Sequence, residues 1–315
     1  MTRPGVRELG RGRLLLDLQF RSRDELVAAY LIPGPDGWTV VETGPTTCLD
    51  SLLAGLGAAG IEPERVARVL VTHIHLDHAG GLGATAGRLP RAELGAHRAG
   101  VRHLVDPSRL IESARRAWGA AADPLWGTVV PVPGDRLRPL DGGERFAVNG
   151  GELEVIATPG HARHHLSFFD APRRAMITGD SAGVFLPGSS TARPAIPPPD
   201  LDLGQLFESL RAMGERRPSE LDYTHFGPVP GGAALLEEYR RSVERWAAVA
   251  LEAAQTEPSV AHVAGALRAA EMERISSSGS APTAERQELI SGVELAAQGL
   301  LRYFQSHGEL PSGER

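Results

Sequence analysis

The segment Thr72-His73-Ile74-His75-Leu76-Asp77-His78-Ala79-Gly80-Gly81 places three histidines and one aspartate within six residues. It follows an apolar run, Val66 to Val71, which predicts a buried strand that ends where the histidines begin. A solvated polar turn is the alternative, but adjacent histidines would repel one another once protonated. So dense a cluster of ligand-type side chains therefore favours a metal site.

The order of these side chains leaves room for two neighbouring ions. In an extended segment, residues two apart point to the same side, so His73, His75 and Asp77 can converge. The turn that follows would direct His78 to a second side. Imidazole nitrogen and carboxylate oxygen suit zinc, and also iron or manganese. The one cysteine, Cys48, lies outside the segment, so no thiolate is close enough to select copper.

Composition and charge exclude several classes of protein. The chain has 315 residues, of which 42% are apolar and 37 are glycine, and this composition is typical of a loop-rich α/β protein. The formal charge of −6 provides no basic surface for nucleic acid. All 33 basic residues are arginine, which excludes catalysis by lysine. A single cysteine cannot form an internal disulfide, and this predicts a reducing, cytoplasmic compartment.

The sequence also argues against export and membrane insertion. No apolar signal-peptide region follows the arginines near the start of the chain. No window approaches the roughly 18 apolar residues that a spanning helix needs. We therefore expect a protein that is not exported and has no membrane partner.

Strands and helices alternate along most of the chain, after a start that reads as antiparallel strands. The predicted strands are 14–20, 26–32, 38–42, 66–71, 93–96, 153–157, 166–169, 174–178 and 221–225, and the predicted helices are 46–59, 82–89, 97–104, 108–118 and 203–213. Residues 105–150 form the least regular part of the chain, where Trp118 and Trp126 are either pocket or core residues. Three of the later strands are followed by, or end in, a ligand-type side chain: His161, Asp180 and His225.

Two long segments depart from this alternation. Residues 186–202 are rich in proline and predict a stiff, extended loop. We interpret this loop as a lid because it comes soon after Gly179-Asp180, at the end of the predicted strand 174–178. From residue 232 onward only helical spacing remains, with a flexible break at 276–280. We therefore predict a first domain at 1–230 and a helical region at 231–315. Its helices would either cover the first domain or pair in a homodimer.

Five short motifs, taken in order, resemble those of the metallo-β-lactamase superfamily. They are Glu42-Thr43-Gly44, His73-x-His75-x-Asp77-His78, Gly160-His161, Gly179-Asp180 and Thr224-His225. The resemblance covers residues 12–230. It implies an α/β (α+β) fold in the form of an αββα sandwich, in which two mixed sheets lie face to face with helices outside, and a dinuclear metal site along one sheet edge.

The resemblance also implies a set of ligands. The first ion would bind His73, His75 and His161, the second Asp77, His78 and His225, and Asp180 would bridge the two. Each ion would then have three donors of its own and a shared carboxylate, which leaves room for a hydroxide and a substrate. We expect two divalent ions as cofactors, zinc before iron or manganese.

One position departs from the family pattern. Glu42 stands where the family usually has an aspartate that supports a ligand from behind, so we expect Glu42 to do the same with a longer side chain. His165 is expected to have a structural or ligand-supporting role. His164 is expected at the surface, and His97 in a capping or solvent position.

The resemblance implies hydrolysis by a bridging hydroxide. Two ions lower the pKa of water from 15.7 toward about 7, so no serine or cysteine nucleophile is needed. Asp77 could take the proton while remaining a ligand, and it is therefore the candidate catalytic residue. We predict a metallo-hydrolase of a small-molecule ester, thioester or lactone. Arg163 and Arg193 are candidate anchors for an anionic part of the substrate.

Other members of the superfamily supply alternatives. A phosphodiesterase or nuclease is disfavoured by the net charge. A persulfide dioxygenase with one iron would need only the first ligand set. A binding module stabilised by metal, without turnover, is the alternative that is not an enzyme. Residues 104–109, 186–190 and 197–200 resemble a branch with no firmly assigned substrate, so the sequence leaves the substrate open.

Overall fold

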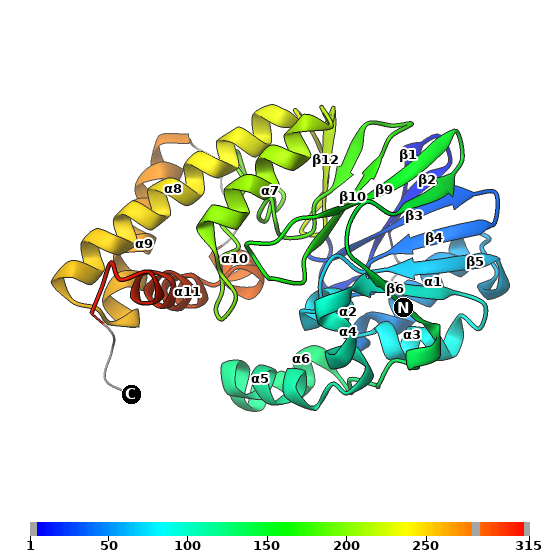
Figure 1. Ribbon diagram of the computed structural model, residues 1–315, viewed down its shortest axis with the longest axis horizontal. Helices are drawn as coiled ribbons and strands as arrows, with labels where there is room; N and C mark the ends of the chain where they lie inside the picture. Colours follow the sequence, from blue (N-terminus) through cyan, green and yellow to red (C-terminus); the bar gives the residue numbers. More distant parts are fainter. Residues whose placement is uncertain (1–4, 279–283, 312–315) are drawn as a thin grey trace.

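The computed structural model describes residues 5–278 and 284–311, which form two facing β-sheets with helices on both outer sides (Figure 1). This arrangement confirms the predicted αββα sandwich. No helix in the described ranges is long and apolar enough to cross a lipid bilayer.

The first sheet contains the strands up to residue 140, and their order in space follows the chain. They are β1 (Val6–Gly10), β2 (Arg13–Asp17), β3 (Ala28–Gly34), β4 (Gly37–Val41), β5 (Val66–Leu70), β6 (Glu93–His97) and β7 (Leu137–Leu140). The strands from β1 to β4 pair antiparallel, whereas those from β4 to β7 pair parallel. Parallel neighbours need a crossover, and helices provide it here.

The second sheet has the order β13-β12-β11-β10-β9-β8. Its strands are β8 (Arg145–Val148), β9 (Gly151–Ala157), β10 (Leu166–Asp170), β11 (Ala175–Ile177), β12 (Glu220–Tyr223) and β13 (Gly227–Pro230). All neighbours pair antiparallel except β11 and β12, which run parallel.

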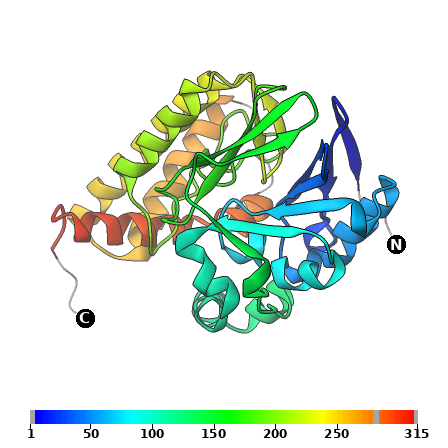
Figure 2. The ribbon, with the colours of Figure 1, turned by 45° about the vertical axis from the view of Figure 1, so that its right-hand side comes forward.

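Helices cover the outer face of each sheet. The helices before residue 140 are α1 (Leu49–Ala58), α2 (Leu76–Ala79), α3 (Leu82–Arg88), α4 (Arg98–Val105), α5 (Ser108–Trp118) and α6 (Ala122–Trp126). Those on the second sheet's side are α7 (Leu203–Glu215), α8 (Ala233–Thr256), α9 (Val260–Ser278) and α11 (Val293–Ser306), whereas α10 (Ala284–Ile290) packs against the core of the first sheet through Leu289 and Ile290. Figure 2 shows α8, α9 and α11, yellow to red, gathered beside the green strands of the second sheet.

Buried side chains on both faces of the strands hold these layers together. Along β10, Leu166 and Phe168 belong to the core between the sheets, while Phe169 belongs to the core beneath the outer helices. This alternation is the period of two that a strand imposes on its side chains. Because both faces are buried, such strands read as continuous apolar runs in the sequence.

Backbone hydrogen bonds join the two sheets at the edge where the histidine segment lies. Leu166 N on β10 donates to the carbonyl oxygen of Thr72, the second residue after β5, at 2.6 Å. Ala28 N on β3 donates to Thr224 O, which directly follows β12, at 2.9 Å. The ends of strands from both sheets are therefore fixed relative to one another at this edge.

A buried ion cluster also connects the sheets. Arg13 on β2 donates through Nη2 to Asp222 Oδ2 on β12 at 2.5 Å, and its Nε lies 3.1 Å from Asp170 Oδ2 on β10. The Arg13 side chain is only 2% exposed. Among the described residues, no other cation lies as close to Asp170 or Asp222 as Arg13 does. Loss of Arg13 would therefore leave two buried acids without their ion-pair partner.

The sequence patterns do not predict β1, β7, β8 and β13. These four strands are the two outermost strands of each sheet. They are short and half exposed, as the alternate buried and exposed residues of β8 show. An edge strand of this kind lacks the apolar run by which a central strand is recognised.

Some predicted boundaries also differ from the structure. The strand predicted at 14–20 ends at Asp17, because Gln19 adopts a φ of 53° and the Asp17 carboxylate accepts from Gln19 N and Glu25 N. The break predicted at 276–280 is wrong for residues 276–278, which continue α9, and residues 279 and 280 lie outside the described ranges. As predicted, residues 186–202 contain no helix or strand. A separate domain from residue 231 stays a prediction.

We predict that Arg13→Ala strongly destabilises the fold. Removing one partner from a buried ion cluster leaves uncompensated charge and costs about 3–5 kcal/mol. Denaturant unfolding of metal-free protein would measure this loss as a fall in the free energy of unfolding. The control is Arg116→Ala, which removes an exposed arginine that pairs with Glu112 and should change stability little. Equal stability of the two variants would contradict the structural role of Arg13.

Candidate metal centre

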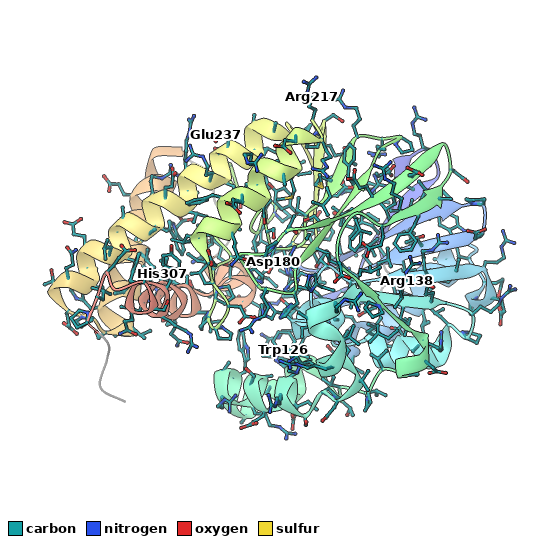
Figure 3. The ribbon with its side chains drawn as sticks, viewed as in Figure 1. Trp126, Arg138, Asp180, Arg217, Glu237 and His307 are labelled. Atoms are coloured by element: carbon teal, nitrogen blue, oxygen red, sulfur yellow. The ribbon has the colours of Figure 1, made fainter. Side chains whose placement is uncertain are left out.

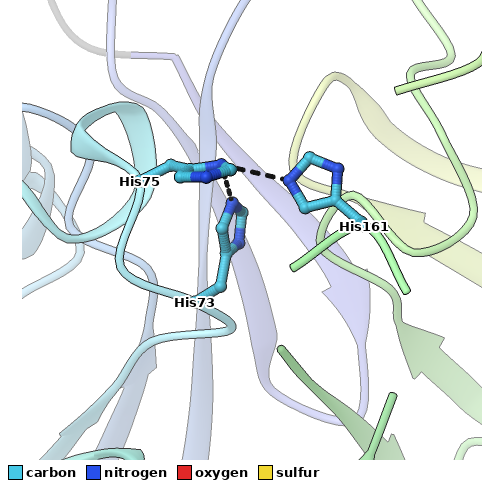
Figure 4. A group of neighbouring side chains, drawn as sticks. All are labelled: His73, His75 and His161. Carbon is cyan, nitrogen blue, oxygen red and sulfur yellow. Dashed lines mark hydrogen bonds between the residues drawn. The ribbon is translucent and has the colours of Figure 1, made fainter. Parts of the chain in front are cut away.

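Three histidine nitrogens converge at the end of β5. His73 Nε2 lies 2.9 Å from His75 Nδ1, and His161 Nε2 lies 3.1 Å from the same atom. Figure 4 shows the three rings turned toward one another, with His161 contributed by a segment far from the other two in the chain. Three neutral imidazoles arranged in this way could hold one zinc-like ion.

A second group lies directly beside the first. His78 Nε2 and His225 Nε2 are 3.2 Å apart, and Asp77 Oδ2 lies 3.8 Å from the former and 3.6 Å from the latter. His78 and His225 are fully buried, whereas 19% of the Asp77 side chain is exposed. This second group also has the donor types and spacing of a metal site.

Asp180 lies between the two groups and offers one oxygen to each. Its Oδ2 is 3.7 Å from His161 Nε2, and its Oδ1 is 3.4 Å from His78 Nε2 and 3.7 Å from His225 Nε2. Oδ1 is buried and has no hydrogen-bond partner among the described residues. A buried acceptor without a partner is costly. A cation beside Oδ1 would remove that cost, so the residues fit two ions that share Asp180.

Backbone carbonyls orient two of the histidines. His225 Nδ1 donates to Leu26 O at 2.7 Å, and His161 Nδ1 donates to Ala195 O at 2.8 Å. A carbonyl oxygen can only accept, so in each ring Nδ1 carries the proton and the Nε2 lone pair faces the centre. This outer contact fixes the tautomer that metal binding requires.

Glu42 lies behind His78, where the family pattern would place an aspartate. Its Oε1 is 3.0 Å from His78 Nδ1 and accepts from Thr72 Oγ1 at 2.5 Å and from Thr224 Oγ1 at 3.2 Å. The backbone of Glu42 has a φ of 76°, in the left-handed region. The side chain of Glu42, one methylene longer than that of aspartate, thus contacts His78 from a residue with left-handed backbone geometry. Its Oε1 has three polar partners.

His165 supports Asp180 from the other side. Asp180 N donates to His165 Nε2 at 3.1 Å, and His165 Nδ1 lies 2.8 Å from Thr158 Oγ1. The preceding Gly179 has a φ of 51°, and a Cβ there would lie 2.6 Å from His165 Nε2. The Gly-Asp motif thus needs glycine so that the chain can pass this close to the ring.

The two remaining histidines near the centre occupy different environments. His164 was expected at the surface, but it is buried, with its ring 6.2 Å from that of His73. Its Nδ1 has no hydrogen-bond partner in the part of the chain that the structure describes. His97 caps α4, because its Nδ1 accepts from Ala99 N at 3.1 Å. The position of His97 agrees with the capping role predicted for it.

Burial and neighbouring charges set the protonation of the histidines. Burial and adjacent imidazoles lower the pKa of His73 well below its ordinary value, and burial lowers that of His75 to about 4. Both rings are therefore neutral near pH 7, as metal ligands must be. Burial also lowers the pKa of His78, but nearby carboxylates, Asp180 foremost, outweigh it and raise that pKa above its ordinary value. The second group thus has a strong preference for positive charge, which a metal ion would satisfy.

A cavity of about 190 Å³ opens beside the metal centre. Four of the predicted site residues line it: His75, Asp77, His161 and Asp180. The rest of its wall comes from Ile74 and Leu76 of the histidine segment, from α5, α6 and residues 195–199, and from the segment from α10 to α11. Figure 3 shows Trp126 of α6 below the labelled Asp180. Trp118 and Trp126 both line this cavity, and Trp126 also stacks on Phe20 in the core.

The two candidate anion anchors do not line the cavity. Arg163 forms an ion pair with Asp200, and 67% of its side chain is exposed. Arg193 is buried, donates to Glu288 Oε1 at 3.0 Å and lies over the ring of Trp246. The structure therefore does not bring either arginine to the centre, and their role in substrate binding stays a prediction.

The C-terminal region contacts the loops that carry the orienting carbonyls. Ser291 Oγ donates to Pro194 O at 2.7 Å, and Arg286 Nη2 donates to Glu25 O at 3.2 Å. Ala195 follows Pro194, and its carbonyl accepts from His161. Leu26 follows Glu25, and its carbonyl accepts from His225. No sequence pattern predicts these contacts, because the partners are separated by about 100 residues or more.

Sequence comparison relates the chain to known proteins. Residues 23–225 match the family model described as the metallo-beta-lactamase superfamily. The metallo-beta-lactamase fold-containing protein ST1585 of Sulfurisphaera tokodaii is 29% identical over 180 residues, which are 56% of this chain and 65% of that protein. An atrochrysone carboxyl ACP thioesterase of Aspergillus fumigatus is 26% identical over 196 residues, which are 62% of this chain and 47% of that protein. The chain thus spans only about half to two thirds of the length of these relatives.

A solved structure extends the likeness over most of the fold. The metallo-beta-lactamase family protein TTHA1429 of Thermus thermophilus superimposes with a TM-score of 0.67. The superposition covers 90% of this chain and 89% of the other, at 21% sequence identity. At this identity the likeness concerns the fold alone. Its coverage extends into the helices that follow the second sheet.

We predict that Glu42→Gln weakens metal binding at the group that contains His78. The amide removes the negative charge behind His78 Nδ1, and losing such an outer partner typically costs about 10–100-fold in affinity. Titration of metal against a competing chelator would measure the change. Glu93→Gln, which alters an exposed glutamate paired with Arg138, is the matched control. Unchanged affinity in Glu42→Gln would show that Glu42 does not support the ligand.

Proposed function

Because the chain belongs to the metallo-beta-lactamase superfamily, we propose that it is a metal-dependent hydrolase that cleaves a small ester, thioester or lactone. The observation that carries this proposal is the position of Asp180 between two groups of ligand-type side chains, with a buried oxygen that has no partner among the described residues. A carboxylate placed in this way can be shared by the two ions of a dinuclear hydrolytic site.

The proposed site would hold two divalent ions, zinc before iron or manganese. One would bind His73, His75 and His161, the other Asp77, His78 and His225, and both would contact Asp180. Such ions lower the pKa of water and polarise a substrate carbonyl. The absence of cysteine from both groups favours zinc, iron or manganese over copper.

Asp77 is the side chain placed to handle the proton. It lines the cavity, and although burial raises its pKa, the neighbouring His78 and His225 lower it to about 2. Asp77 is therefore a carboxylate at neutral pH. Because it lines the cavity, we assign to it the role of accepting a proton from water as the water oxygen bonds to the acyl carbon. The bond from that carbon to oxygen or sulfur then breaks, and the proton passes to the leaving group.

The proposed substrate is a small molecule rather than a nucleic acid. No arginine is among the described residues that line the cavity, so apart from the proposed metal ions no cation there would contact a phosphate backbone. The thioesterase named among the relatives supports a thioester within the proposed class. The buried and free Cys48 agrees with the proposed cytoplasmic location.

We predict that His75→Ala removes bound metal and hydrolytic activity together. His75 Nδ1 is the atom that both other histidines of its group approach, so its loss opens that group. Metal analysis and thioester hydrolysis, measured on the same purified sample, test this.

The control is His262→Ala, which removes an exposed histidine on α9 and should leave both quantities unchanged. A His75→Ala variant with full metal content and full turnover would contradict the assignment. In wild-type protein, a chelator should abolish turnover and added zinc should restore it.

A further inference from the structure

We propose that the cavity beside the metal centre binds an uncharged, apolar acyl group of the substrate, about as large as a phenyl ring or a six-carbon chain. The inference rests on the proposed hydrolytic function and names the class of substrate for that site. It follows from the chemistry, the shape and the rigidity of the cavity wall.

The wall divides into a polar floor and apolar sides. Among the described residues that line it, the only titratable side chains are the four of the metal centre: His75, Asp77, His161 and Asp180. Ser113 and Ser291 also line the cavity; the Ser291 hydroxyl donates to Pro194 O and is already satisfied, and Ser113 is exposed. A substrate would therefore place its reacting carbonyl at the floor and the rest of its acyl group against a largely apolar wall.

Helix α5 supplies one side, on which an apolar stripe is flanked by the small side chains of Ser113 and Ala117. Leu110, Ala114 and Trp118 recur at four-residue steps, which brings them to one face of the helix. All three are half buried and line the cavity, and α5 has no fully buried residue. Trp118 also packs edge to face on Trp126 at 5.7 Å between ring centres. This apolar stripe thus faces the cavity and has no complete protein cover.

The opposite side is held rigidly against α11. A Cβ at Gly299 would lie 2.1 Å from Ile196 O, so this glycine allows the helix and the proline-rich loop to touch through their backbones. The loop then presents the three prolines at 197–199 to the cavity, and Leu295 of α11 lies beside them. This side is therefore preformed and lets a ligand bind without ordering the loop.

The volume accommodates an acyl group of this size. The cavity measures about 190 Å³, while a dry, apolar cavity of about 150 Å³ in a protein is large enough for benzene. A phenyl ring or a six-carbon chain fits this space.

A terminal charge would be rejected. Arg193 pairs with Glu288 and Arg163 with Asp200, and neither arginine lines the cavity. A carboxylate at the end of the acyl chain would lose its water without gaining a cation, which is strongly unfavourable. The cavity therefore selects neutral acyl groups.

The test compares methyl thioesters of acetic, butanoic, hexanoic and adipic acid, with zinc-loaded protein and release of methanethiol as the readout. The small leaving group keeps the cavity free for the acyl part. We expect kcat/KM to rise by up to about fourfold for each added methylene, and by at least tenfold in total from acetyl to hexanoyl. The monothioester of adipic acid has the same chain length as the hexanoyl thioester but ends in a carboxylate, and its kcat/KM should not exceed that of the acetyl thioester. Equal rates for hexanoyl and adipoyl, or a preference for acetyl, would overturn the proposal.

A pair of variants tests the location. Ala114→Leu adds volume to the α5 stripe and should lower the ratio of hexanoyl to acetyl kcat/KM by about tenfold. Ala120→Leu adds the same side chain at an exposed position that lines none of the described cavities, and it should leave the ratio unchanged. An unchanged ratio in Ala114→Leu would place the acyl site elsewhere.

A binding measurement separates this proposal from the proposed function. Zinc-loaded protein is titrated with acetate, hexanoate and adipate, and the fluorescence of the tryptophans is followed, since two of them line the cavity. Hexanoate should bind at least tenfold more tightly than either of the others, even if no thioester is cleaved. If hexanoate binds more tightly but no substrate is cleaved, the proposed hydrolytic function is contradicted and the apolar acyl site is not. Equal binding of hexanoate and adipate would overturn the apolar acyl site.

Discussion

Seven side chains of the types that bind metal, five buried and two half-buried, lie within a few ångströms of one another, and the rest of this structure depends on that constraint. Imidazole nitrogens lie about 3 Å apart in both groups, and Asp180 Oδ1 has no hydrogen-bond partner among the described residues. Such an arrangement is costly unless cations are present, because buried polar groups need partners. Three outer contacts orient the histidine rings. The carbonyls of Leu26 and Ala195 and the carboxylate of Glu42 each contact the Nδ1 of one ring, so that its Nε2 faces the centre.

The two-sheet architecture makes this burial possible. The ligand-type side chains come from the ends of strands in both sheets, and these ends are joined directly by the hydrogen bonds from Leu166 N to Thr72 O and from Ala28 N to Thr224 O. Arg13 connects the sheets through buried carboxylates on β10 and β12. The outer helices then serve two purposes. They cover the sheets, and through α5 and the segment from α10 to α11 they enclose the space beside the metal centre.

The central strands and the histidine motifs could be predicted from the sequence because their signals are local. An apolar run followed by ligand-type side chains specifies a buried strand and the chemistry at its end, as in β5 and the segment after it. The edge strands β1, β7, β8 and β13 lack such a run. The burial of His164, the ion pair between Arg193 and Glu288, and the cavity wall formed by α11 depend on contacts between distant parts of the chain. Spacing alone carries no information about such contacts.

We propose that the two groups hold two metal ions that share Asp180. A crystal of the zinc-loaded protein, with anomalous diffraction recorded above the zinc absorption edge, would test this directly. We expect two peaks about 3.5–4 Å apart, one beside His73, His75 and His161 and the other beside Asp77, His78 and His225. A single peak, or two peaks that do not both contact Asp180, would show that the site is not a dinuclear centre of this kind.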